Sequence, residues 1–200
     1  MTDLVLKDKT VIISSQYLPL RELFSAIITS GRIYMDGDEL WRKQTLANRT
    51  FILGANGEQT LSIPIQHTGG VKTPVKQMRI SYSQPWSRVH KGALFSAYNT
   101  SPFFTFFRDE LFEIFDAQPE YLHAFNLALF KCLLGKLKYT GEILEELPQG
   151  EYADLRGKLT RGEIKESYPT GETYNQVFSS KFPFSSYLSA LDCIANTGTV

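Results

Sequence analysis

The chain has few residues of the kinds that identify a site or a compartment by themselves. Cys132 and Cys193 are its only cysteines, and both lie in apolar helical patterns without the spacing of metal ligands. We therefore expect two reduced thiols in the core and neither a zinc site nor a disulfide framework. The histidines, His67, His90 and His123, are scattered along the chain, so no metal site is predicted.

An excess of charge and long apolar runs are also missing. The 21 basic and 21 acidic residues give a formal net charge of zero, so there is no overall attraction to nucleic acid or to an anionic membrane. No apolar run reaches the about 20 residues that span a bilayer, and no basic leader precedes one. We predict a cytoplasmic protein with no membrane span and no nucleic-acid partner, in which any anion site is local.

Signatures of familiar catalytic machinery are absent as well. The chain has no G-x-S-x-G elbow, no glycine-rich phosphate loop and no H-E-x-x-H pair. Adjacent carboxylates such as Glu145 and Glu146 lie in stretches that are typical of a solvated surface. No single motif therefore identifies a reaction, and neither a cofactor nor an oligomeric state follows from the sequence.

What the sequence does contain is the pattern of an α/β fold that opens with a strand–helix–strand unit. Residues 10–14 form a short apolar run, apolar residues then repeat at helical spacing over 20–28, and 32–36 return as a strand. Such a unit predicts a parallel crossover, and the functional edge of a parallel sheet is the one where its strands end.

A hairpin and a group of helices are predicted to follow. Strands at 50–53 and 60–65 flank Asn56-Gly57, a tight-turn pair, and a further strand is expected around Ile80. Ser101 and Pro102 resemble the start of a helix. We predict a mixed sheet with helices packed on it, in one domain with these parts: 1–84 mainly sheet, 85–137 helical, 138–200 a loop-rich tail that ends in a helix near Gly198.

Three polar residues interrupt apolar helical faces. His90 follows Trp86 by one turn, and it is either a partly buried histidine satisfied by a neighbour or a general acid or base, because its ordinary pKa is about 6.5. Asn126 lies on an apolar face, where an amide without partners costs about 1 to 3 kcal/mol. We expect it to hold a backbone group or a ligand. Asp192 raises the same question in the last helix.

The segment WRKQTLANRT concentrates hydrogen-bonding side chains just before the first hairpin strand. Lys43 offers a mobile charge, Arg49 a planar fork for a phosphate or carboxylate, and Asn48 can hold the turn or donate to a ligand. The alternative is that Arg49 pairs with Asp36 or Asp38 and only fixes the loop. Both interpretations stay open at the level of sequence.

A series of short motifs runs through most of the chain in a fixed order. They are Q-Y-L-P at 16–19, a strand ending in Asp36, Lys43-Gln44, Asn48-Arg49, W-x-x-x-H at 86–90, A-Y-x-x-S-P-F-F at 97–104, F-N at 125–126, Y-x-Q-V-F at 174–178 and S-x-L-D at 189–192. This order resembles the WbqC-like family, and it is most similar to the short members found in Bacteroidetes. Many relatives carry His-Gln-Pro ahead of the tyrosine, whereas this chain has Ser14-Ser15-Gln16.

The resemblance implies a role in bacterial O-antigen or surface-polysaccharide biosynthesis, but it does not specify a reaction. The site residues that it suggests are His90 as the catalytic group and Lys43, Asn48, Arg49, Tyr17, Tyr98 and Asn126 as substrate-binding groups. Two functions compete: an enzyme, such as a transferase, that binds an anionic or nucleotide-linked sugar, and a non-catalytic binding or assembly protein. The opening is also similar to nucleotidyl-transferring domains, but the His-x-Gly-His signature is missing.

Overall fold

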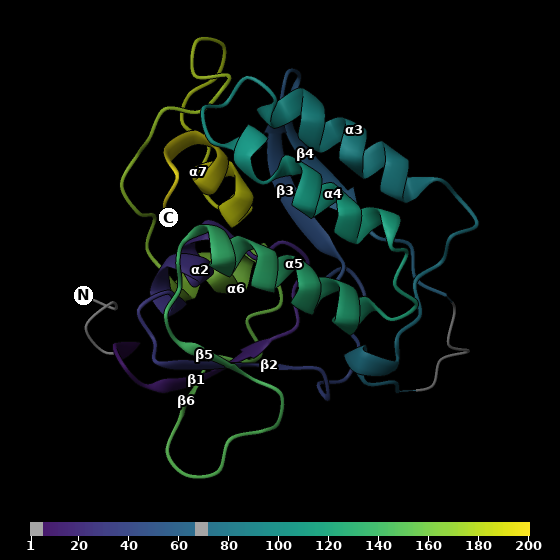
Figure 1. Cartoon of the computed structure of the whole chain (residues 1–200), viewed down its shortest axis with the longest axis vertical. Helices are drawn as coiled ribbons and strands as arrows, with labels where there is room; N and C mark the ends of the chain where they lie inside the picture. The colour runs from purple at the N-terminus through teal and green to yellow at the C-terminus, as the bar shows by residue number, and fades with distance from the viewer. Residues whose placement is uncertain (1–5, 67–71) are drawn as a thin grey trace.

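A computed structural model describes residues 6–66 and 72–200, and a short parallel sheet forms one end of it (Figure 1). The sheet has the order β5-β2-β1-β6, with these bounds: β1 Thr10–Ser14, β2 Arg32–Asp36, β5 Glu142–Leu144 and β6 Ala153–Asp154. Helix α2 (Arg21–Ile27) connects β1 to β2, which pair in parallel with Ser14 opposite Asp36. The predicted strand–helix–strand unit is confirmed.

The predicted hairpin is also confirmed, although it forms a sheet of its own. Strands β3 (Arg49–Gly54) and β4 (Gly57–Ser62) pair antiparallel, and Gly57 has the positive φ of 105° that the tight turn requires. We expected one mixed sheet, but in the described residues the hairpin does not join the parallel strands. The reason is that β5 and β6 occupy the two outer positions beside β2 and β1.

The helices of the middle of the chain largely follow the apolar periodicity. Their bounds are α3 Trp86–Tyr98, α4 Arg108–Asp116 and α5 Leu122–Lys136. The predicted start at Ser101 and Pro102 is wrong, because the Ser101 hydroxyl donates back to the Tyr98 carbonyl at the end of α3. A 3₁₀ helix, η2 (Phe104–Phe106), then buries Phe104 before α4 begins.

The tail departs most from the expectation of a surface loop. It supplies both β5 and β6, followed by helix α6 (Arg161–Ser167), whose first turn is closed by a capping box between Thr160 and Glu163. The last helix, α7 (Ala190–Thr197), ends as predicted at Gly198, which has a φ of 77°. Residues 138–200 therefore contain three short elements before the final helix, which the sequence did not predict.

The predicted strand around Ile80 is reduced to single bridges. Ile80 bridges to Ile65 and Arg79 to Tyr121, after a 3₁₀ helix η1 (Val75–Gln77). The backbone of this segment divides its hydrogen bonds between two neighbours, since the Ile80 N–H donates to Glu120 and the Ser81 N–H to Pro64. A segment that changes partner at each residue does not build a ladder.

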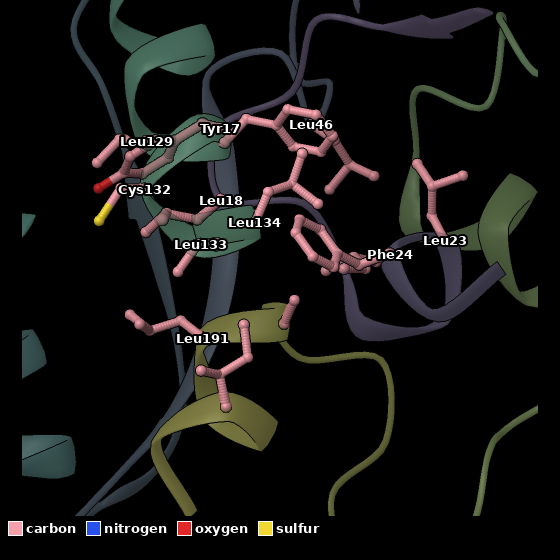
Figure 2. Packing of buried hydrophobic residues seen from close by; sticks show 14 of the residues in the cluster. Tyr17, Leu18, Leu23, Phe24, Leu46, Leu129, Cys132, Leu133, Leu134 and Leu191 are labelled. Carbon is pink, nitrogen blue, oxygen red and sulfur yellow. The ribbon is translucent and has the colours of Figure 1, made fainter. Parts of the chain in front are cut away.

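One hydrophobic cluster includes side chains from the parallel sheet, the hairpin and the helices. Figure 2 shows Phe24 of α2 between Leu23 and the leucines of α5, with Leu191 of α7 below them. Cys132 and Cys193 are buried free thiols, as predicted, and burial raises the pKa of Cys132 to about 12. The assignment of residues 1–200 to one domain stays a prediction.

Candidate functional site

The Tyr17–His90 pair lies where the segment after β1 meets α3. The Tyr17 hydroxyl is 2.9 Å from His90 Nδ1, and the two rings stack with centroids 5.7 Å apart. Burial lowers the pKa of His90 to about 4, with an opposing hydrogen bond to the backbone of Ser62, and burial raises the pKa of Tyr17. At neutral pH Tyr17 therefore donates to a neutral imidazole.

The surroundings of this pair are aromatic and dry. His90 is 4% exposed and Tyr17 is fully buried. The edge of Trp86 faces His90 at a centroid distance of 5.1 Å, and Phe125 stacks on Tyr17 at 5.9 Å. The interpretation of His90 as a buried histidine satisfied by a neighbour thus describes its position, while the catalytic role stays a prediction.

Arg49 is the first residue of β3, and its side chain is half-buried. In the described residues its side chain makes no hydrogen bond and no ion pair, and its Nε is shielded from solvent without a partner. The alternative pairing with Asp36 or Asp38 is wrong, because Arg156 binds Asp36 at 2.6 Å and Lys76 binds Asp38 at 2.5 Å. The loop is not fixed by an Arg49 salt bridge.

Arg49 also lies near His90 through the hairpin. It pairs across the two strands with Ser62, and the Ser62 backbone is the group that faces the His90 ring. Asn48, the preceding residue, donates from Nδ2 to the Ile63 carbonyl at 2.8 Å, which leaves its Oδ1 shielded and unpaired. We call Asn48, Arg49, Ser62 and His90 the hairpin mouth, which holds two unpaired polar atoms, Arg49 Nε and Asn48 Oδ1, that are shielded from solvent.

Asn126 supports this region from the core of α5. It is fully buried, and its Nδ2 donates to Ser15 Oγ at 3.1 Å and to the Ala47 carbonyl at 2.9 Å. It therefore ties the segment after β1 to the segment before β3. We expected this amide to hold a backbone group or a ligand, and it holds a backbone group, the Ala47 carbonyl. Asn126 Oδ1 has no partner among the described residues.

The remaining predicted site residues are Lys43 and Tyr98. Lys43 is exposed on the loop before β3 and has no ion pair in the described residues. Tyr98 follows His90 by eight residues on α3, a separation of about 12 Å along the helix axis. It lies near Asp192, and burial together with that carboxylate raises the pKa of Tyr98. The structure places Tyr98 beside Asp192 and not beside Arg49.

Asp192 is the third polar residue on an apolar helical face, and it binds residues of the C-terminal tail. Its carboxylate accepts hydrogen bonds from the Tyr174 hydroxyl at 2.7 Å and from Gln176 Nε2 at 3.1 Å. Burial raises the pKa of Asp192, and these hydrogen bonds oppose the shift. The carboxylate thus fastens residues 174–176 to α7.

A polar group at the carboxyl edge of the parallel sheet was missed from the sequence. Arg156 binds Asp36 after β2 and Asp154 at the end of β6, each at 2.6 Å, and hydrogen bonding to these carboxylates raises its pKa. The Gly157 N–H donates to Ser14 Oγ at the end of β1. The only local signal is four alternating residues at 153–156, which are too few to predict a strand.

The remaining histidines are His67 and His123. His67 lies outside the described residues, and His123 lies in the first turn of α5. Within the part of the chain that the structure describes, no three metal-binding side chains come together. Over the same residues, no helix has both the length and the hydropathy to span a bilayer.

These features define an α/β protein that combines a short parallel sheet, a separate antiparallel hairpin and packed helices. Residues 14–148, more than half of the chain, match the model of the WbqC-like protein family. The chain belongs to this family. No curated protein and no solved structure matches it significantly. The matched range ends before β6, so Arg156 and α7 lie outside it.

Proposed function

We propose that the chain is an enzyme of bacterial O-antigen or surface-polysaccharide biosynthesis that binds an anionic substrate, such as a nucleotide sugar, at the hairpin mouth. The observation that carries the proposal is the unpaired guanidinium of Arg49, because a charged group without a protein partner at a partly buried position gains most from an anionic ligand. Membership of the WbqC-like family supports the pathway.

The other predicted site residues have different roles in this proposal. Asn48 offers an unpaired acceptor beside Arg49, and exposed Lys43 adds a local positive charge that attracts the ligand. Buried Tyr17, Asn126 and Tyr98 hold the surrounding elements. His90, which is neutral at neutral pH, keeps the catalytic role in this proposal, and loss of turnover in His90→Asn with unchanged substrate affinity is the expected sign.

Arg49→Lys is expected to weaken binding of a nucleotide sugar about tenfold, because lysine keeps the charge but loses the two parallel hydrogen bonds of guanidinium. The melting temperature is expected to stay unchanged, since Arg49 has no protein partner in the described residues. Calorimetric titration with nucleotide sugars and with inorganic phosphate, beside a melting curve, measures both quantities.

Arg88→Lys is the matched control, because Arg88 is an exposed arginine of α3 without an ion pair in the described residues. It is expected to bind like the unmodified chain. Unchanged affinity in Arg49→Lys with a lowered melting temperature would contradict the anion site and assign Arg49 to stability.

A second candidate is a non-catalytic assembly protein, and one observation favours it. Phe95, Phe103 and Phe106 are 43%, 39% and 75% exposed, and the rings of Phe103 and Phe106 lie 6.4 Å apart. Exposed aromatic side chains in contact are typical of protein-binding surfaces. If the chain is an assembly protein, nucleotide sugars do not bind it. Phe106→Ser then changes the sedimentation of its complex with a protein partner, whereas Arg49→Lys does not.

A further inference from the structure

A separate pocket lies between the ends of β2 and β5 and helix α5. Its volume is about 300 Å³, and its lining comes from five parts of the chain: Tyr34 and Met35 of β2, Gly37 and Asp38 after it, Lys76 of η1, His123, Leu127 and Lys131 of α5, and Leu144 and Glu145 at the end of β5. None of the hairpin-mouth residues lines it. In open α/β sheets, ligands bind in crevices beyond the carboxyl ends of parallel strands, and this pocket has that position.

The wall of the pocket is shaped by close packing at Gly37. A Cβ atom at this position would lie 2.9 Å from Lys76 Cβ and 3.0 Å from the His123 ring. The absence of a side chain therefore lets α5 and η1 approach the end of β2. Leu127 and Leu144 add apolar surface beside the ring of Tyr34, whereas the side chain of Met35 is buried in the core.

Several polar groups of the lining have no protein partner. Lys131 and Glu145 make no ion pair in the described residues, and both are exposed. His123 Nδ1 is shielded from solvent and has no hydrogen-bond partner there. Lys76 and Asp38, in contrast, neutralise each other at 2.5 Å. The free groups thus comprise a cation, a carboxylate and an imidazole nitrogen.

This combination favours a ligand with hydroxyl groups over a charged one. The two ammonium groups and two carboxylates of the lining sum to zero, so the pocket has no net attraction for an anion or a cation. A hydroxyl group both donates and accepts, and can therefore bind Glu145 and Lys131 alike. The volume is at the lower end of the about 300 to 1,000 Å³ found for ligand pockets, which fits a small molecule.

We propose that this pocket binds a small neutral polyol of monosaccharide size, with its hydroxyl groups on Lys131, Glu145 and His123 and its apolar C–H face on Tyr34, Leu127 and Leu144. Leu144 and Tyr34 come from adjacent strands whose residues pair, so the apolar wall is continuous with the sheet. The site is independent of Arg49 and of the function proposed for the hairpin mouth.

The test is saturation-transfer NMR on the full chain with glucose, galactose, mannose, N-acetylglucosamine and myo-inositol. At least one is expected to bind with a dissociation constant in the millimolar range, since the pocket is small and open to water. Lys131→Met and Glu145→Gln are each expected to weaken that binding about tenfold, the usual effect of losing a hydrogen bond to a charged group. Both positions are exposed, so unchanged melting curves are expected.

Glu146→Gln and Lys138→Met are matched controls on exposed neighbours outside the pocket lining, and Arg49→Lys separates this site from the hairpin mouth. These three variants are expected to bind the polyol as tightly as the unmodified chain does. This expectation holds even if no nucleotide sugar binds at the hairpin mouth. Absence of polyol binding, equal binding by the pocket variants, or stronger binding of phosphate or glycine than of every polyol would overturn the proposal.

Discussion

Acidification from about pH 7 to about pH 4 is expected to lower the free energy of unfolding of this protein by about 3 kcal/mol more than that of a His90→Asn variant. The native pKa of His90 is about 4, whereas its ordinary value is 6.5. Between pH 4 and pH 6.5 the imidazole of His90 binds a proton in the unfolded chain but stays neutral in the native protein. Stability from this residue is therefore present above the ordinary pKa and is lost as the pH falls.

Urea unfolding at several pH values measures the difference, and asparagine suits the comparison because its Oδ1 can accept the Tyr17 hydroxyl where Nδ1 did. Burial also lowers the pKa of His123, so His123→Gln is the control that accounts for its smaller contribution in the same direction. Parallel stability curves for the unmodified chain and His90→Asn would show that the native site accepts a proton as readily as the unfolded chain.

Asn126→Leu is expected to lower the free energy of unfolding by about 3 kcal/mol at neutral pH. Leucine has a similar size but cannot donate, so the Ala47 carbonyl and the Ser15 hydroxyl lose the two hydrogen bonds that join the segment before β3 to the end of β1. Unpaired buried groups lose the full free energy of hydration, which makes this effect larger than that of a surface hydrogen bond.

Asn99→Leu is the matched control, because Asn99 is exposed at the end of α3, where a substitution changes stability by about 0.5 kcal/mol or less. Chemical denaturation compares the two variants. Asn126→Leu with unchanged stability and reduced affinity for a nucleotide sugar would show that the amide serves a ligand and not the fold.

The comparison of Arg49 with Arg156 shows where reasoning from sequence reaches its limit. The sequence offers Arg49, 13 positions away, as one partner for Asp36, whereas the ion pair forms with Arg156, 120 positions away. The pairing is decided by β6, which brings Arg156 to the end of β2. Because ion pairing depends on distance in space, the separation along the chain does not predict it.

For the candidate site residues, too, the sequence predicted some features and not others. The sequence identified His90 and Asn126 as polar residues on apolar helical faces, since helical periodicity predicts which side chains enter the core. It could not show that Tyr17 satisfies His90, or that Tyr98 faces Asp192 and not the hairpin mouth. Those partners come from distant segments, and only packing brings them together.

The sequence by itself determined the elements whose signals are local: the first two strands with α2 between them, the turn at Gly57, and helices α3, α5 and α7. Their hydrophobic period and turn residues act over a few positions. Only the tertiary structure decided the places of β5 and β6, with three and two residues, and the separation of the hairpin from the parallel sheet. Strands that short have too few residues to show a period, and they are stabilised by the neighbours with which they pair.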